Sequence, residues 1–323
     1  MKKGKRLIVF DGNYMLQRAL HTPVFQELTH NGKPTGGIFG TIRAISECLV
    51  KYPSRKCVMV WDGKRSERRM EMFPEYKANR RAKDAEERKA KKEFRALLRD
   101  QMKKLIKILP HLGVVNMRLP KREGDDLIYL IAKEWYRSGK QGAAKTVVVT
   151  EDKGLLQVVN KHVHVYQPSK KIFVSSANFK RVTGVPRCNY LLARAINGDS
   201  SGAYKNSDNI DGVYLVGEKG VRDLLQSEEK KLSIPKLTYL CEALGGAKLK
   251  RVAESSELLE RNLELMDVKR ERWTRSDQRF VQEALAETAT PDIRAFGKKA
   301  KALGFESITS GLPYFFKPFQ RLQ

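Results

Sequence analysis

Three short apolar runs in the first half of the chain share one layout. They are residues 7–10 before Asp11, residues 58–61 before Asp62, and residues 146–149 shortly before Asp152. Continuous apolar runs of this length, rich in β-branched side chains, are typical of strands buried on both faces of a sheet. The pattern therefore predicts three interior strands, each followed at its carboxyl end by an acidic residue.

Helical patterns occupy the segments between these runs, at residues 37–51, 86–109 and 125–138. Alternating strands and helices predict an α/β fold with a central, mostly parallel sheet flanked by helices. Ligands of such sheets bind at the carboxyl ends of the strands. Helix capping would explain any one of the three acidic residues, but three together indicate a shared cleft.

Residues 77–107 differ from the rest of the chain in charge, with thirteen Lys and Arg against five acidic residues. The second half has apolar residues at helical spacing, whereas the first half has almost no apolar face. A solvated helix is one interpretation. The excess of one sign favours a basic helical arch at about residues 77–108 that projects over a phosphate-bearing ligand.

Beyond about residue 186 the strand signals stop and helical patterns follow one another. We therefore predict an α/β domain at residues 1–185 and a helical C-terminal, DNA-binding region at residues 186–323. The aromatic tail at residues 312–323 either packs on its own domain or docks a replication partner.

Composition narrows the class of partner. A net charge of +26 across 323 residues favours a nucleic acid, because each phosphate contact releases a condensed counterion. A membrane surface is the alternative, but no basic segment has the Trp/Phe face of an interfacial helix. No apolar run approaches a bilayer span, and residues 7–10 are too short for a signal-peptide core, which predicts a cytoplasmic protein, or a host-cytoplasmic one if phage-encoded. Four separated cysteines without a CxxC pair argue against a zinc or disulfide framework.

Further carboxylates extend the candidate site. Glu123, Asp125 and Asp126 precede an apolar helix, and Asp199 and Asp208 lie in turn-rich sequence. Capping or Asx turns would explain any one of them. With Asp11, Asp62 and Asp152 they make eight carboxylates, which suit Mg²⁺ or Mn²⁺ better than zinc. Two such ions would activate a water and stabilise the leaving oxygen of a phosphodiester.

In order along the chain, these motifs resemble the 5′-nuclease (flap endonuclease) family in its compact bacterial and phage-type form. They are residues 9–12 (VFDG), 61–64 (WDGK), 73–80 (FPEYKANR), 123–126 (EGDD), 151–153 (EDK), 198–200 (GDS) and 207–210 (SDNI), with residues 261–267 (RNLELMD) near the end. Each is weak alone, but the ordered set is highly specific. No polymerase module follows, so the chain resembles the stand-alone enzyme.

The resemblance implies roles for individual residues. Asp11, Asp62, Glu123, Asp125 and Asp126 would hold the first metal group, and Asp152, Asp199 and Asp208 the second. Catalytic contacts with the scissile phosphate would come from Lys77 and Arg80 at the base of the arch, and Arg18 would line the active site. Nucleic-acid contacts would come from Tyr76, by stacking on an unpaired base, and from Arg81 and Lys83.

The family also has a helix–hairpin–helix that grips duplex DNA through main-chain amides, often with K⁺. Residues 208–226 occupy that place, and Gly212, Gly217 and Lys219 are expected to bind nucleic acid there. Leu215 stands where the family has a glycine, and Asp211 and Tyr214 stand where it has prolines. These changes predict an altered duplex grip and leave the K⁺ site an open question.

Two further departures affect the second metal group. Gly154 stands where the family has a second Asp, with Glu151 as an alternative ligand. Six extra residues, 201–206, separate Asp199 from Asp208. Because the second metal group has fewer carboxylates than the family pattern, cleavage at flaps is expected to be weaker than cleavage at simple 5′ ends.

The sequence therefore predicts a monomeric, structure-selective 5′-nuclease of DNA replication or repair that uses two Mg²⁺ or Mn²⁺ ions. Its substrates would be DNA with a 5′ flap, nick or free 5′ end, or an RNA–DNA duplex. The alternatives are a PIN-type ribonuclease, which shares the acidic sheet-end site, and a catalytically impaired protein that only binds DNA junctions.

Overall fold

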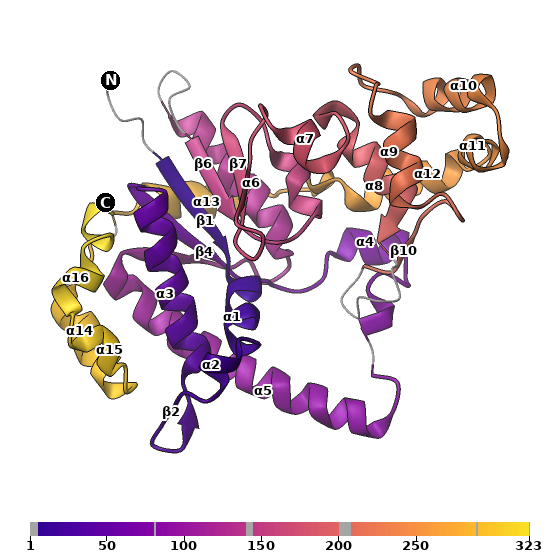
Figure 1. The fold of residues 1–323 in the computed structure, drawn as a ribbon. Coiled ribbons are helices and arrows are strands. Elements are labelled where there is room, and N and C mark those ends of the chain that lie inside the picture. Colours follow the sequence, from indigo (N-terminus) through magenta and orange to yellow (C-terminus); the bar gives the residue numbers. More distant parts are fainter. Residues whose placement is uncertain (1–5, 81, 140–144, 200–207, 289, 323) are drawn as a thin grey trace.

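The computed structural model describes residues 6–80, 82–139, 145–199, 208–288 and 290–322. Its centre is a six-stranded sheet (Figure 1) in the order β5-β4-β1-β6-β7-β8. The strands are β1 (Arg6–Asp11), β4 (Lys56–Val60), β5 (Val114–Met117), β6 (Lys145–Val149), β7 (Val163–Gln167) and β8 (Ile172–Val174). Neighbouring strands are parallel except β7 and β8, which are antiparallel. The predicted α/β class with a mostly parallel sheet is confirmed.

Strand β1 shows why an unbroken apolar run was the right signal. Alternate side chains of a strand point to opposite faces. Leu7 and Val9 join one core, Ile8 and Phe10 join the other, and all four are fully buried. Both faces of the sheet are therefore covered, as buried parallel strands require.

Helices cover the two faces in separate layers. On the first face lie α1 (Gly12–Leu20), α3 (Gly36–Lys51), the end of α5 (Ala85–Ile108) and η2 (Leu109–Leu112). On the second face lie α6 (Gly124–Ser138), η4 (Gly154–Val158), α7 (Phe179–Thr183) and α13 (Arg275–Ala286). Between α1 and α3 lie α2 (Pro23–Gln26) and the hairpin of β2 (Thr29–His30) and β3 (Lys33–Pro34). Between β4 and α5 lie α4 (Glu67–Met72) and η1 (Ala78–Arg80).

Helix α5 forms most of the basic segment. Asp84 caps it by accepting a hydrogen bond from the Glu87 amide at 2.7 Å. Leu105 and Ile108 in its last turns are buried in the core, whereas its first half is largely exposed and projects away from the sheet (Figure 1). The helix is therefore anchored through its second half, where Phe94, Leu97, Leu98 and Met102 also pack against the core, as the amphipathic pattern predicts.

A smaller helical lobe follows the sheet domain and has a hydrophobic core of its own. It contains η5 (Arg187–Asn189), α8 (Tyr190–Asn197), β9 (Gly198–Asp199), β10 (Ile210–Asp211), α9 (Gly217–Leu225), α10 (Ile234–Leu244), α11 (Ala247–Ala253) and α12 (Ser256–Met266). The segment η6 (Val268–Arg270) then leads back to the sheet domain.

The end of the chain departs from the predicted domain boundary. After α13 come α14 (Ile293–Ala302), α15 (Glu306–Thr309), α16 (Leu312–Phe316) and η7 (Phe319–Arg321). Phe296, Phe316 and Phe319 are buried in the same core as α3, and the segment lies beside α3 in Figure 1. The helical lobe thus ends near residue 266, and the remaining residues complete the sheet domain. No helix within the described ranges has the length and apolar character that a bilayer crossing requires.

Candidate active site

Asp11 ends β1 and is the N-cap of α1. Its carboxylate accepts hydrogen bonds from the Tyr14 amide and the Thr150 hydroxyl, both at 3.0 Å. These bonds fix it at the carboxyl edge of the sheet, between the ends of β1 and β6. The strand-end position predicted from the apolar run is therefore the observed one.

Asp62 follows β4 and connects three elements. It accepts hydrogen bonds from the Gly124 amide at 2.7 Å and from the Asn13 side-chain amide at 2.8 Å. Asn13 in turn accepts a bond from the Asp62 amide at 3.2 Å. A Cβ atom on Gly124 would lie 2.7 Å from an Asp62 oxygen, so a larger residue here would displace the Asp62 side chain. Asn13 is a site residue that the sequence analysis did not single out, although it stands two residues after Asp11.

Asp125, in the first turn of α6, faces the carboxylates of neighbouring strands. Burial raises its pKa well above the usual value, and the nearby charges of Asp152, Asp11 and Asp62 raise it further. Burial, together with Asp62 and Asp152, also raises the pKa of Asp11 to about 7, against the hydrogen bonds from Tyr14 and Thr150. Concentrated negative charge of this kind is relieved by a bound cation.

The donor set at this edge fits a hard divalent cation, since it consists of carboxylate oxygens without His or Cys. Asp11, Asp62, Asp125 and Asp152 lie close enough to one another to raise the pKa of Asp11 and Asp125. Among the described residues, however, no three acidic, His or Cys side chains form a ready-made coordination shell. The side chains therefore have to adjust when an ion binds.

Glu123 and Asp126 belong to the same acidic motif but face a different set of partners. Glu123 accepts hydrogen bonds from Arg69 at 3.1 Å, the Tyr76 hydroxyl at 2.8 Å and the Lys77 ammonium at 2.9 Å. Asp126 is fully buried and forms a bidentate pair with Arg69, at 2.6 and 2.7 Å. Burial alone would raise the pKa of Glu123, but Lys77 and Arg69 outweigh it and lower that pKa.

Thus three of the five residues expected in the first metal group, Asp11, Asp62 and Asp125, interact electrostatically with one another, whereas Glu123 and Asp126 pair with cations. Asp126 is turned by one helical position from Asp125 and points into the protein, where Arg69 compensates its charge. In this conformation it is a structural ion-pair residue, which departs from the metal role that the resemblance implied.

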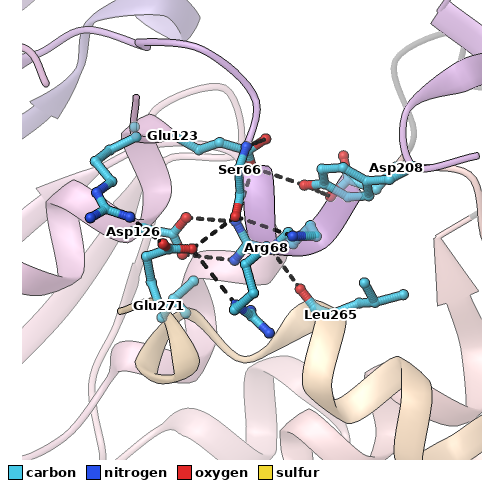
Figure 2. A network of polar contacts seen from close by, with 12 residues as sticks. Ser66, Arg68, Glu123, Asp126, Asp208, Leu265 and Glu271 are labelled. Atoms are coloured by element: carbon cyan, nitrogen blue, oxygen red, sulfur yellow. Dashed lines mark hydrogen bonds and ion pairs between the residues drawn. The ribbon is translucent and has the colours of Figure 1, made fainter. Parts of the chain in front are cut away.

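Arg69 is the centre of a buried network that the sequence analysis missed. Its Nε donates to the Leu265 carbonyl at 2.8 Å, so it connects α4, α6 and the end of α12. Figure 2 shows this network, with Asp126 and Glu271 on the left and Leu265 at the lower right. Glu271 also pairs with Arg122 at 2.6 Å and accepts from the Ser66 hydroxyl at 2.9 Å. The sequence does not distinguish Arg69 from the many exposed basic residues of this chain, such as those of α5, because nothing in its neighbouring residues marks it as buried.

Lys77 and Arg80 lie at the start of the basic segment, as expected. Lys77 has a left-handed backbone (φ 58°), and its amide donates to the Asp208 carbonyl at 2.9 Å. Its ammonium lies 3.6 Å from the Asp208 carboxylate, which Arg80 contacts at 2.8 Å. Lys77 thus contacts the carboxylates of Glu123 and Asp208, and Arg80 contacts that of Asp208.

Tyr76 corrects one expectation. Its side chain is 2% exposed and packs with Ile210 and Leu265, while its hydroxyl bonds Glu123. A ring enclosed in this way cannot stack on a nucleic-acid base. The apolar ring and its polar tip instead join the sheet domain to the hairpin region.

The second acidic group contains Asp152, Asp199 and Asp208. Asp152 accepts from the Gly154 amide at 2.5 Å, and Glu151 turns away to accept from the Ser169 amide at 2.6 Å. Glu151 therefore does not replace the carboxylate that the family has at the position of Gly154.

Asp199 and Asp208 lie together despite the extra residues between them. Asp199 pairs with Ile210 in the short β9–β10 ladder and lies 3.6 Å from Arg194. Burial raises the pKa of Asp199, as do the charges of Asp208 and Asp152, against Arg194. The extra residues, 201–206, lie outside the described part of the chain.

The other residues predicted to contact the substrate lie apart from the acidic cluster or outside the described residues. Arg18 is exposed on α1 and lines a cavity of 670 Å³ between α1, α3 and Phe305. Lys83 is exposed beside the start of α5, and its amide donates to Glu87 at 2.7 Å. Arg81 lies outside the described residues.

The segment predicted to be a helix–hairpin–helix, residues 208–226, leads from β10 into α9 and contains one backbone anomaly. The Val213 amide donates to the Ile196 carbonyl at 2.7 Å, and a Cβ atom on Gly212 would lie 2.3 Å from the Asn197 backbone. Gly217 has a positive φ with open space around it, and Lys219 is exposed in the first turn of α9. Leu215 has a left-handed backbone (φ 59°) and is 59% exposed. Leucine thus occupies a conformation that favours glycine.

Comparison with known proteins identifies the family. Residues 6–184 match the model of the 5′-3′ exonuclease N-terminal, resolvase-like domain. The 5′-3′ exonuclease of Buchnera aphidicola subsp. Baizongia pistaciae is 29% identical over 227 residues, which are 70% of this chain and 68% of that protein. DNA polymerase I of Streptococcus pneumoniae is 26% identical over 95% of this chain, which spans 33% of the polymerase.

Solved structures support the same fold. The chain superposes on the structure of the T5 5′-exonuclease with bound zinc with a TM-score of 0.65 and 20% sequence identity. The superposition covers 93% of this chain and 99% of the T5 chain. At that identity the likeness shows the fold. Because the family model spans more than half of the sequence, the chain belongs to the 5′-3′ exonuclease family and is a nuclease, as its ordered acidic motifs predicted.

Proposed function

We propose that this protein is a structure-selective 5′-nuclease that hydrolyses phosphodiesters at 5′ flaps, nicks and free 5′ ends of DNA. The observation that carries the proposal is the convergence of Asp11, Asp62, Asp125 and Asp152 at the carboxyl edge of the sheet. This edge lies next to Lys77 and Arg80, at the start of the basic segment that continues into α5. Acidic ligands beside cations provide both a metal site and a phosphate site.

The residues that would hold Mg²⁺ or Mn²⁺ are Asp11, Asp62 and Asp125 in one group and Asp152, Asp199 and Asp208 in the other. When bound, such ions generate hydroxide and stabilise the leaving oxygen of an in-line displacement. Glu123 lies at the amino end of α6, next to Asp125, and is proposed to help position the first group. Two ions are proposed, and the absence of a carboxylate at Gly154 makes the second group the weaker.

Lys77 and Arg80 are proposed to contact the scissile phosphate. In the structure their charges are compensated by Glu123 and Asp208, so the approach of a phosphate offers them an alternative anion. Either cation would stabilise the charge that develops on the phosphate oxygens in the transition state. The exposed basic residues of α5 would hold the single strand by charge.

The hairpin at residues 208–226 is proposed to contact duplex DNA on the far side of the junction. Gly217, with open space around it, and Lys219, in the first turn of α9, suit a phosphate. Strain at Leu215 is evidence that the hairpin retains a backbone shape that its own side chain does not favour. A K⁺ ion there and an RNA–DNA substrate are secondary proposals.

A cleavage assay with Mg²⁺ tests the proposed substrate class, using a 5′-flap duplex, a nicked duplex and single-stranded RNA in parallel. We expect cleavage of the flap and nick, with little of the RNA. Asp62→Asn should reduce cleavage by at least about a hundredfold while the flap still binds. Flap binding without cleavage by the wild-type chain would refute the proposal, and preferential cleavage of the RNA would favour a PIN-type ribonuclease.

A further inference from the structure

A groove of 510 Å³ runs between α3 and the C-terminal helices, on the first face of the molecule. Leu49, Val50 and Ile308 supply apolar lining, and Tyr314 stands at its side. Val50 is 66% exposed and Tyr314 is 87% exposed. Large apolar side chains that are exposed together, around a preformed groove, are typical of an interaction surface.

The groove is separate from the nuclease site. Helix α3 ends at Lys51, shortly before β4 begins at Lys56. Leu49 and Val50 in its last turn therefore lie near the amino ends of the parallel strands, whereas Asp11 and Asp62 lie at their carboxyl ends. None of the described residues that line the groove belongs to the acidic site.

The charges that line the groove indicate which kind of partner it can bind. The charged side chains among the described lining residues are Arg43, Lys317 and Arg321, and no carboxylate lines the groove. Arg43 contacts Glu47 at 3.7 Å on the exposed surface of α3, and an exposed pair of this kind contributes little in water. An apolar floor with a cationic rim complements a ligand that is apolar at one point and acidic around it.

The segment that forms one wall of the groove is held in place by packing against the core. Phe315 stacks on Phe296 with 6.0 Å between ring centroids and lies 5.9 Å from Phe319. Phe296 and Phe319 are fully buried, so the segment that carries Tyr314, Lys317 and Arg321 is held in place by the core. A preformed wall lowers the conformational cost of binding.

We propose that this groove binds an acidic peptide segment of a partner protein. An aromatic or aliphatic side chain of the peptide packs on Leu49, Val50 and Tyr314. Neighbouring carboxylates of the peptide face Lys317 and Arg321. A nucleic-acid backbone fits less well, because phosphates would gain nothing from the apolar floor.

The test uses a short fluorescein-labelled peptide with a run of aspartates followed by leucine and phenylalanine, and measures its binding by fluorescence anisotropy. Saturable binding is expected. Lys317→Glu/Arg321→Glu should weaken it by about tenfold or more, and Tyr314→Ser should weaken it as well. All three side chains are exposed, so the variants should fold, which thermal unfolding checks.

Two controls make the result specific. Lys230→Glu/Lys231→Glu changes net charge equally on an exposed part of the helical lobe and should leave peptide binding unchanged. A peptide with serine in place of leucine and phenylalanine should bind weakly. Cleavage of a 5′ flap by Lys317→Glu/Arg321→Glu should match the wild type, so failure of this inference is distinct from failure of the nuclease proposal. Absence of saturable binding, equal loss in both charge variants, or displacement of the peptide by oligothymidylate with a matching loss of DNA affinity would each overturn the proposal.

Discussion

At the scale of single residues, two carboxylates of the candidate site have opposite surroundings. Asp62 is exposed and bonded to an amide and a side-chain amide, whereas Asp126 is buried against a guanidinium. The sequence shows only that both are acidic residues near predicted strand or helix ends. Asp126 is turned away from the cleft because it pairs with Arg69. The position of Arg69 depends on the packing of α4 between α6 and α12, which a single sequence does not reveal.

This contrast predicts different outcomes for two isosteric substitutions. Asp126→Asn removes the bidentate anion of the buried Arg69 and leaves it only the contact with Glu123 at 3.1 Å, so it should lower the free energy of unfolding by about 3 kcal/mol. Asp62→Asn keeps an oxygen for the Gly124 amide and should change stability by less than about 1 kcal/mol. Urea denaturation of the metal-free proteins measures both. Equal stability of the two variants would show that the Arg69 pair is unimportant to the fold.

Leu215 gives a second prediction at this scale. Leu215→Gly removes the strain of a left-handed leucine and should stabilise the hairpin by up to about 1 kcal/mol, net of the greater backbone freedom of glycine. Leu215→Ala removes the same exposed side chain but keeps the strained backbone, so it is the matched control and should give no gain. Thermal unfolding tests the difference. If the glycine variant is no more stable than the alanine variant, the strain argument fails.

At the scale of elements, the carboxyl ends of β1, β4 and β6 and the amino end of α6 bring like charges together. The fold therefore carries an electrostatic cost wherever Asp11 and Asp125 are ionised and no cation is bound. The layout of apolar runs and acidic ends predicted this concentration. It did not predict that Glu123 and Asp126 would be compensated within the protein.

Stability of the metal-free protein should consequently fall as pH rises. The folded pKa of Asp11, about 7, exceeds its ordinary value of 3.8, so the folded state binds the proton more tightly than the unfolded chain. This contribution is fully present below about pH 4 and is lost as pH rises through 7, a difference of a few kcal/mol. Asp125 acts in the same direction. Unfolding in urea with a chelator, from pH 5 to 8, measures the trend, and Mg²⁺ at pH 8 should restore stability. A metal-free stability that rises across this range would contradict the interpretation.

Helix α5 is the element whose function depends most on charge. Arg88, Lys89 and Lys92 are exposed near its free end. Replacing all three with alanine should weaken flap binding and reduce the slope of log affinity against log salt by about 0.7 for each lost single-strand phosphate contact. The matched control is alanine at Lys298 and Lys299 on α14, far along the chain, which should leave the slope unchanged. An unaltered slope in the α5 variant would mean that the strand does not run along this helix.

At the scale of the whole molecule, the predicted helical region of residues 186–323 divides in two, because the helices after about residue 266 pack on the sheet domain. Helical spacing in residues 277–285 indicates a helix without indicating its partner. Val281 and Leu285 pack against α6, across more than a hundred residues of intervening chain. Long-range packing of this kind depends on shape complementarity that hydrophobic periodicity does not encode. The aromatic tail shows the same point, because Phe316 and Phe319 complete the core while Tyr314 remains exposed.

The two cores should therefore respond differently to loss of one large side chain. Phe319 and Leu237 are both fully buried, the first with α3 and the second in the helical lobe. Phe319→Ala should cost about 3–5 kcal/mol in the sheet domain and lower the temperature at which cleavage is lost. Leu237→Ala should cost about 2–5 kcal/mol within the lobe, weaken duplex binding, and leave the sheet domain ordered. Limited proteolysis and near-ultraviolet circular dichroism separate the outcomes, because the chain's three tryptophans, Trp61, Trp135 and Trp273, all lie outside the lobe. If Phe319→Ala instead loosens only the lobe, the terminal helices belong with the DNA-binding region; if both variants unfold the whole chain together, the two cores form one cooperative unit.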